Sequence, residues 1–226
     1  MQRTAFNEGL NVLYGLLLEE EGLIEAMLSD AVKALKTGDL ELAKDVVDRD
    51  QRVDRLAEGI EAEVVLLIAR HQPVGSDLRR MVSAIKNVID LERVGDLSTN
   101  IARAVPEIAS QGLLKPLIDI PRMAGIAQEM LKDGITALKD EDMNLAKRVC
   151  ARDEEMDALH WQIFRELLVF MMQDPKTIGK ALPLLFVARH LERVGDHATN
   201  IAETVIYNVT GLRRKAKEFE GMTPEG

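Results

Sequence analysis

The segment Leu91-Glu92-Arg93-Val94-Gly95-Asp96 recurs without change as Leu191-Glu192-Arg193-Val194-Gly195-Asp196, at an offset of 100 residues. Residues 99–102 recur as 199–202 at the same offset. Three earlier blocks recur at an offset of 103: 34–36 as 137–139, 42–44 as 145–147, and Arg49-Asp50-x-x-x-Asp54 as Arg152-Asp153-x-x-x-Asp157. A repeat of about 100 residues is longer than a tetratricopeptide or HEAT unit. The sequence therefore predicts an internal duplication.

Each repeat consists of helix-forming stretches. Segments of roughly 30 residues, rich in Ala, Leu, Glu, Lys, Arg and Met, lie between Gly- and Pro-containing breakers. Apolar residues follow helical spacing, as at Val46, Val53, Ala57, Ile60, Val64 and Leu67. Asp39 and Ser76 stand at expected N-cap positions. We predict an all-α protein of six long helices, each about 40–50 Å, arranged as two tandem three-helix bundles over residues 1–112 and 113–226.

Composition excludes several classes of protein. The 226 residues include 38 acidic and 29 basic side chains, for a net charge of -9, which argues against binding to nucleic acid. A single cysteine, Cys150, cannot form an internal disulfide. The apolar runs are too short to span a bilayer, and the segment Met1–Glu8 lacks the apolar core of a signal peptide. We therefore expect a cytoplasmic protein.

The duplication preserves acidic pairs four residues apart. They are Asp50/Asp54, Glu92/Asp96, Asp153/Asp157 and Glu192/Asp196. Residues at this spacing share one helix face, where two like charges destabilise a helix by a few tenths of a kcal/mol. A bound multivalent cation would offset that repulsion, because hard cations prefer clustered oxygen ligands. Asn100 and Asn200 follow Asp96 and Asp196 by four residues, so each adds a further oxygen to the helix face of its acidic pair.

A simpler interpretation is that these pairs form solvated helix faces neutralised by Arg93 or Arg193. The matched spacing in both repeats favours cation binding over that interpretation. On a helical wheel the carboxylates face away from the apolar row of Val94, Leu97 and Ile101. We therefore expect the acidic side chains to lie on an accessible surface of each bundle.

Histidine and nucleophile patterns are weaker. Asp157-x-x-His160 resembles half of a di-iron motif, but no second copy is present. His190 and His197 flank the second acidic motif, where the first repeat has Asp90 and Leu97. No Gly-rich phosphate loop and no nucleophile motif occur, so we assign no catalytic residue.

The run Arg189–Glu203 and its first copy, Leu91–Ala102, resemble the signature of the PhoU family. The resemblance covers nearly the whole chain and implies two pseudo-symmetric three-helix bundles. It also implies a negative regulator of the bacterial phosphate-starvation response and of phosphate uptake. Such a regulator couples the ATPase subunit of the phosphate ABC transporter to a sensor histidine kinase, and reaches the membrane through these partners.

The resemblance further implies a metal site, because some PhoU proteins carry multinuclear iron or zinc clusters on Glu/Asp-x-x-x-Asp motifs. The four acidic pairs match those motifs, and Mg, Mn or Ca remain alternatives. We also expect a homodimer without enzymatic activity. The alternative functions are a carboxylate-rich metalloenzyme and a metal-storage helical bundle.

Overall fold

The computed structural model describes residues 2–212, which form six α-helices and no β-strand. The helices range from 22 residues in α4 to 36 in α1 and α3. Their bounds are Gln2–Thr37 (α1), Leu40–His71 (α2), Ser76–Gln111 (α3), Asp119–Asp140 (α4), Met143–Gln173 (α5) and Ile178–Thr210 (α6), with a short 3-10 helix, η1, at Pro175–Thr177. The predicted all-α fold and the six helices are confirmed, but the predicted length of 40–50 Å is wrong for α4, whose 22 residues extend about 33 Å.

Equivalent turns begin the second helix of each repeat. The side chain of Asp39 accepts a hydrogen bond of 3.0 Å from the backbone N–H of Leu42, and Asp142 does the same for Leu145. Such N-caps stabilise a helix by about 1 kcal/mol. The prediction of Ser76 as an N-cap is wrong, because Gly75 occupies that position and Ser76 is already helical.

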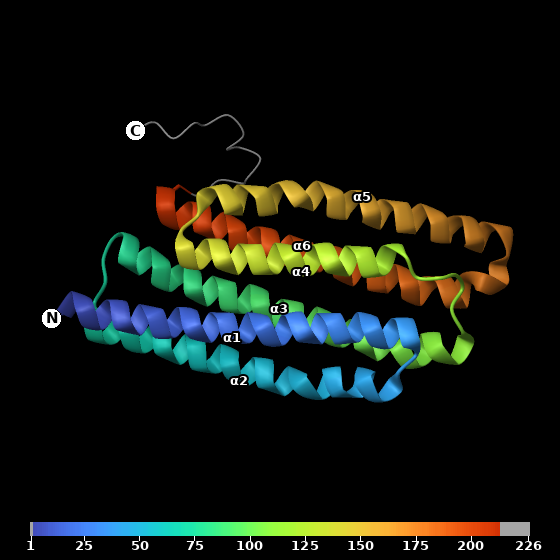
Figure 1. Cartoon of the computed structure of the whole chain (residues 1–226), viewed down its shortest axis with the longest axis horizontal. Helices are drawn as coiled ribbons and strands as arrows, with labels where there is room; N and C mark the ends of the chain where they lie inside the picture. The colour runs from blue at the N-terminus through green and yellow to red at the C-terminus, as the bar shows by residue number, and fades with distance from the viewer. Residues whose placement is uncertain (1, 213–226) are drawn as a thin grey trace.

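The helices form two layers (Figure 1). One layer has the order α2–α3–α6–α5, in which α3 packs against α6 and joins the two repeats. The other layer consists of α1, which packs on α2 and α3, and α4, which packs on α5 and α6. The connection between the repeats runs from residue 112 to residue 118, where Pro116 disfavours helix. The proposed division of the chain at residue 112 falls in this connection.

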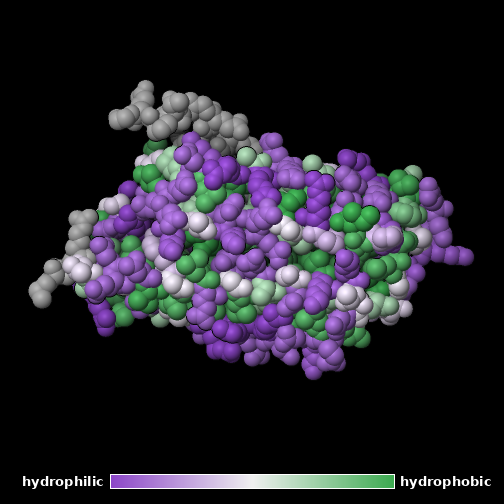
Figure 2. Space-filling model, viewed as in Figure 1, coloured by the Kyte–Doolittle hydropathy of each residue, from purple (hydrophilic) through white to green (hydrophobic). Residues whose placement is uncertain are grey.

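The core runs along the contacts between the two layers. It is built from fully buried apolar side chains such as Leu13, Leu17, Ile60 and Met130. The outside is different: hydrophilic residues cover most of the face seen in Figure 2, and hydrophobic residues appear in scattered groups. The acidic motifs therefore lie on helices whose opposite faces are fixed by core packing.

Candidate functional site

A glycine in each repeated motif allows two helices to approach closely beside the acidic pairs. A Cβ atom at Gly95 would lie 3.3 Å from Cγ1 of Val53 on α2. In the second repeat, a Cβ atom at Gly195 would lie 3.2 Å from Cγ of Met156 on α5. Both distances are shorter than ordinary carbon contacts. The motif glycine thus brings the acidic pair of one helix next to that of its neighbour.

In the first repeat, carboxylates of α2 and α3 influence one another. Burial raises the pKa of Glu92; the charge of Arg93 opposes this shift, and those of Asp96 and Asp54 add to it. Burial also raises the pKa of Asp50, and the charges of Asp54 and Asp96 contribute. The four predicted residues of this repeat therefore belong to one electrostatic cluster. Arg93 partly neutralises it through a 3.2 Å ion pair with Asp96.

The second repeat has a similar cluster at the contact of α5 and α6. Burial raises the pKa of Glu192, and the charges of Asp196 and Asp157 contribute, while Arg189 lowers it. Arg189 forms an ion pair with Glu192. The expectation of an accessible surface is wrong for Glu192, which is only 9% exposed. The close packing of α5 at Gly195 explains why this turn of α6 is covered.

Asp153 has different surroundings from its counterpart, Asp50. Burial raises the pKa of Cys150 to about 12, and the charges of Glu203 and Asp153 contribute. The first repeat has Arg103 at the position of Glu203, and Arg103 lowers the pKa of Asp50. Asp153 and Glu203 thus both lie close to the thiol of Cys150. The high pKa of Cys150 makes its thiol a poor nucleophile at neutral pH.

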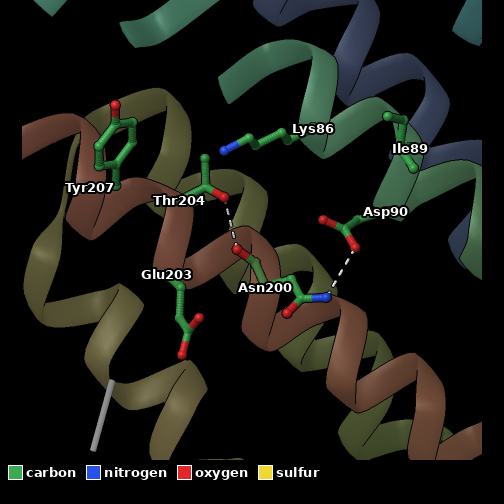
Figure 3. Close-up of a pocket in the computed structure, with 7 residues that line it drawn as sticks. All are labelled: Lys86, Ile89, Asp90, Asn200, Glu203, Thr204 and Tyr207. Carbon is green, nitrogen blue, oxygen red and sulfur yellow. Dashed lines mark hydrogen bonds between the residues drawn. The ribbon is translucent and has the colours of Figure 1, made fainter. Parts of the chain in front are cut away.

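Asn200 lies at the contact between the repeats (Figure 3). Its side-chain amide donates a hydrogen bond of 3.1 Å to Asp90 on α3. Asp90 also lies 2.8 Å from Nδ1 of His197. Asp90 and Asn200 border a surface pocket of about 300 Å³, where Lys86 Nζ lies 5.7 Å from the ring centroid of Tyr207. To bind a cation at the acidic motif, Asn200 would have to break its hydrogen bond with Asp90. The assignment of Asn100 as a ligand stays a prediction.

The donor set suits a hard cation, but the observed geometry is not a formed metal site. Within the described residues, no group of three or more His, Cys, Asp or Glu side chains is arranged to hold a metal ion. Arg93 and Arg189 instead neutralise part of each cluster. A cation would therefore have to displace these arginines and draw the carboxylates together.

Two buried carboxylates of α1, Glu20 and Glu21, were not predicted. Glu20 on α1 is fully buried, neither of its carboxylate oxygens has a hydrogen-bond partner, and burial together with the charge of Glu92 raises its pKa to about 8. A signal was present in the sequence, because Glu20 continues the apolar row of Leu13 and Leu17 at helical spacing. The second repeat has Met123 at the counterpart position. The buried acid is thus specific to the first bundle.

Comparison with known proteins identifies the family. The model of the PhoU domain matches residues 17–105 and again residues 120–205. The chain belongs to the PhoU family. The two PhoU domains coincide with the two repeats, as the resemblance in the repeated motif implied.

Individual PhoU proteins agree with this assignment. A protein named phosphate-specific transport system accessory protein PhoU homolog, from Rhizobium meliloti, is 41% identical over 93% of this chain and 89% of its own length. The crystal structure of PhoU from Pseudomonas aeruginosa superposes with a TM-score of 0.87 at 37% identity, covering 92% of this chain and all of that one. The phosphate transport system regulatory protein PhoU from Streptococcus pneumoniae gives a TM-score of 0.85 at 28% identity, covering 92% of this chain and 99% of that one.

The PhoU domains described here contain no helix that is both long and apolar enough to cross a membrane.

Proposed function

We propose that this PhoU protein is an accessory regulator of phosphate transport that keeps the phosphate-starvation response off when phosphate is ample. The supporting observation is the pair of PhoU domains, which span both repeats, together with relatives named as accessory and regulatory proteins of phosphate transport. Measurement of phosphate uptake tests this role. Deletion of the gene should raise uptake in phosphate-rich medium, whereas unchanged uptake would contradict it.

The proposed partners are the ATPase subunit of the phosphate ABC transporter and the sensor histidine kinase. Two similar helix pairs, α2–α3 and α5–α6, present one acidic face per repeat, which suits a protein that contacts two partners. We further propose a cytoplasmic homodimer that reaches the membrane through these partners. Binding of the purified ATPase subunit to the full chain, measured by calorimetry, tests the adaptor role, and the absence of binding would contradict it.

Metal binding at the acidic pairs is a separate proposal. The clustered carboxylates of Asp54, Glu92 and Asp96, and of Asp157, Glu192 and Asp196, supply the oxygen ligands that a multinuclear iron or zinc cluster, or Mg, Mn or Ca, would use. When bound, such a cluster would neutralise the acidic face. Elemental analysis of protein purified without a chelator or metal-affinity tag tests this proposal.

We propose that the protein is not an enzyme. The acidic clusters are partly neutralised by arginine, and the one cysteine thiol has a raised pKa. Metal-loaded protein should therefore show no turnover of phosphate esters. Turnover that disappears on substitution of Glu192 would instead support the metalloenzyme alternative.

A further inference from the structure

The two acidic clusters differ in the positive charge beside them. In α6, an arginine stands three residues before the glutamate of the repeated motif, and this residue, Arg189, forms an ion pair with Glu192. The corresponding residue of α3 is Ile89, which is exposed and carries no charge. Arg93 and Arg193 belong to the repeated motif itself, so both clusters have them. Arg189 is therefore an additional cation of the second repeat.

Arg189 acts on several groups of the second cluster. Burial raises the pKa of Asp196, and the charge of Arg189 is the largest of those that oppose this shift. Burial lowers the pKa of His160 and the charge of Arg189 lowers it further, while the charge of Asp157 raises it. With the ion pair to Glu192, the influence of Arg189 extends over the contact of α5 and α6. A metal cation bound at this contact would act on the same groups in the same direction.

A metal cation has more to displace in the second repeat than in the first. In the first repeat, the side chains of Arg93 and Asp96 are both largely exposed in their ion pair, and water weakens a pair of this kind. The partner of Arg189 in the second repeat is different, because the side chain of Glu192 is only 11% exposed and its Oε2 has no hydrogen-bond partner. Removal of the guanidinium would leave this buried carboxylate uncompensated, which is costly.

The first cluster also has a further carboxylate, on the side of α1. This helix packs on both α2 and α3, and the pKa of Glu20 is raised by burial and by the charge of Glu92. Both oxygens of Glu20 are buried and have no hydrogen-bond partner. The second repeat has Met123 at the corresponding position. Because a buried carboxylate without a donor is unfavourable, the free oxygens of Glu20 are available to a cation held by Glu92.

One difference between the repeats has the opposite sign. Burial raises the pKa of Asp50 and the charge of Arg103 opposes this shift, whereas the second repeat has Glu203 at the position of Arg103. Within the described part of the chain, however, Arg103 forms no ion pair with Asp50. A cation bound in the first repeat would therefore not have to displace Arg103. The residue that must be displaced from a buried carboxylate is Arg189.

We propose that the acidic cluster of the first repeat binds a divalent cation more tightly than that of the second, with Glu20 as an added ligand, and that Arg189 is the built-in counter-cation of the second repeat. This inference deepens the proposed metal binding and rests on it. The two sites fill in order: the first repeat takes up the cation first, and the second repeat does so only at concentrations that displace Arg189. The duplicated motif thus supplies two sites of different affinity.

Reciprocal exchange of one residue between the repeats tests the proposal. Ile89→Arg gives the first repeat the residue of the second, and Arg189→Ile does the reverse. Both side chains are about half exposed, at 46% and 53%, so both helices should be retained. Mn²⁺ is titrated into each full-length protein, and the free ion is measured by electron paramagnetic resonance. Ile89→Arg should weaken the tight class of sites about tenfold, and Arg189→Ile should strengthen the weak class by a similar factor.

Three further variants assign the two classes of site. Asp54→Asn with Glu92→Gln should abolish the tight class, and Asp157→Asn with Glu192→Gln should abolish the weak class alone. Glu20→Met, which introduces the residue of the second repeat, should weaken the tight class about tenfold and leave the weak class within about twofold of wild type.

Two controls accompany these variants. Glu19→Met, at the exposed position next to Glu20, should leave both classes unchanged. Circular dichroism of each variant should match the wild-type spectrum, which shows that the fold is intact. If Arg189→Ile does not fold, Ile89→Arg still decides the question, because it adds the arginine without leaving a buried carboxylate unpaired.

Several outcomes would overturn the proposal. Loss of the tight class in the second-repeat variant, or unchanged affinities after the exchange of residues 89 and 189, would contradict it while leaving metal binding in place. A tight class that Glu20→Met does not weaken would contradict the assignment of Glu20 as a ligand. If the wild-type chain binds no Mn²⁺, the proposed metal binding fails together with this inference.

Discussion

The carboxylate of Asp90 on α3 lies 2.8 Å from Nδ1 of His197 on α6, and it also accepts a 3.1 Å hydrogen bond from Asn200. Asp90 and His197 are both positions at which the two repeats differ, because His190 and Leu97 are their counterparts. Two departures from the duplication thus meet at the contact between the bundles. Leu97, the counterpart of His197, cannot form a hydrogen bond with its side chain. The polar contact between Asp90 and His197 therefore has no equivalent at the matching positions of α3 and α6.

Asp90→Leu should lower the stability of the protein. The side chains of Asp90 and His197 are only 16% and 15% exposed, and the substitution removes the acceptor shared by His197 and Asn200. We expect the free energy of unfolding in urea to fall by about 1–2 kcal/mol. In a double-mutant cycle with His197→Leu, the coupling should be about 1 kcal/mol. Additive effects of the two substitutions would contradict a direct interaction.

Glu20→Met should stabilise the protein, and more so at high pH. The pKa of Glu20 is about 8 in the folded chain against an ordinary value of 4.5, so the folded state binds the proton more tightly. The stability of the wild type therefore falls as the pH rises from 4.5 to about 8. The variant should gain roughly 2–4 kcal/mol at pH 9 and less than about 1 kcal/mol at pH 5.

Urea unfolding at both pH values measures the effect. Glu19→Met, at an exposed position next to Glu20, is the control and should not change the pH dependence. If the gain from Glu20→Met were the same at pH 5 and pH 9, the buried carboxylate would not carry the raised pKa.

Gly195→Val should separate α6 from α5. A Cβ atom at Gly195 would already lie 3.2 Å from Cγ of Met156, and valine adds two further carbons. We expect a loss of about 1–3 kcal/mol in thermal or urea unfolding. Met156→Ala in the same chain should recover part of the loss by making room. Gly22→Val, at a site with no neighbour within 4 Å, is the control, and an equal loss there would indicate an effect of helix propensity alone.

Substitutions at the acidic motif should change metal content in opposite directions. Glu192→Ala with Asp196→Ala removes two oxygen ligands and should lower the bound metal. Arg189→Met removes the cation that pairs with Glu192, and should therefore raise it. Elemental analysis measures the metal, and circular dichroism confirms that helix content is retained. Identical metal content in all three proteins would rule out this site.

The sequence contained most of the information on the fold, and less on the site. The repeated hexapeptide and the spacing of the breakers were sufficient for the duplication and the six helices. The covered position of Glu192 and the bond from Asn200 to Asp90 depend on packing between helices, which periodicity within one helix does not describe. The pairing of Asp90 with His197 was visible only as two differences between the repeats. Glu20, by contrast, occupies the next core-facing position after Leu13 and Leu17 at helical spacing, so its burial could have been predicted.

The most direct test of the proposed function is a reporter driven by a phosphate-starvation promoter, measured in phosphate-rich medium. In a strain that lacks the gene, we expect strong reporter activity, and reintroduction of the wild-type gene should restore repression. A deletion strain that remains fully repressed would contradict the regulatory role.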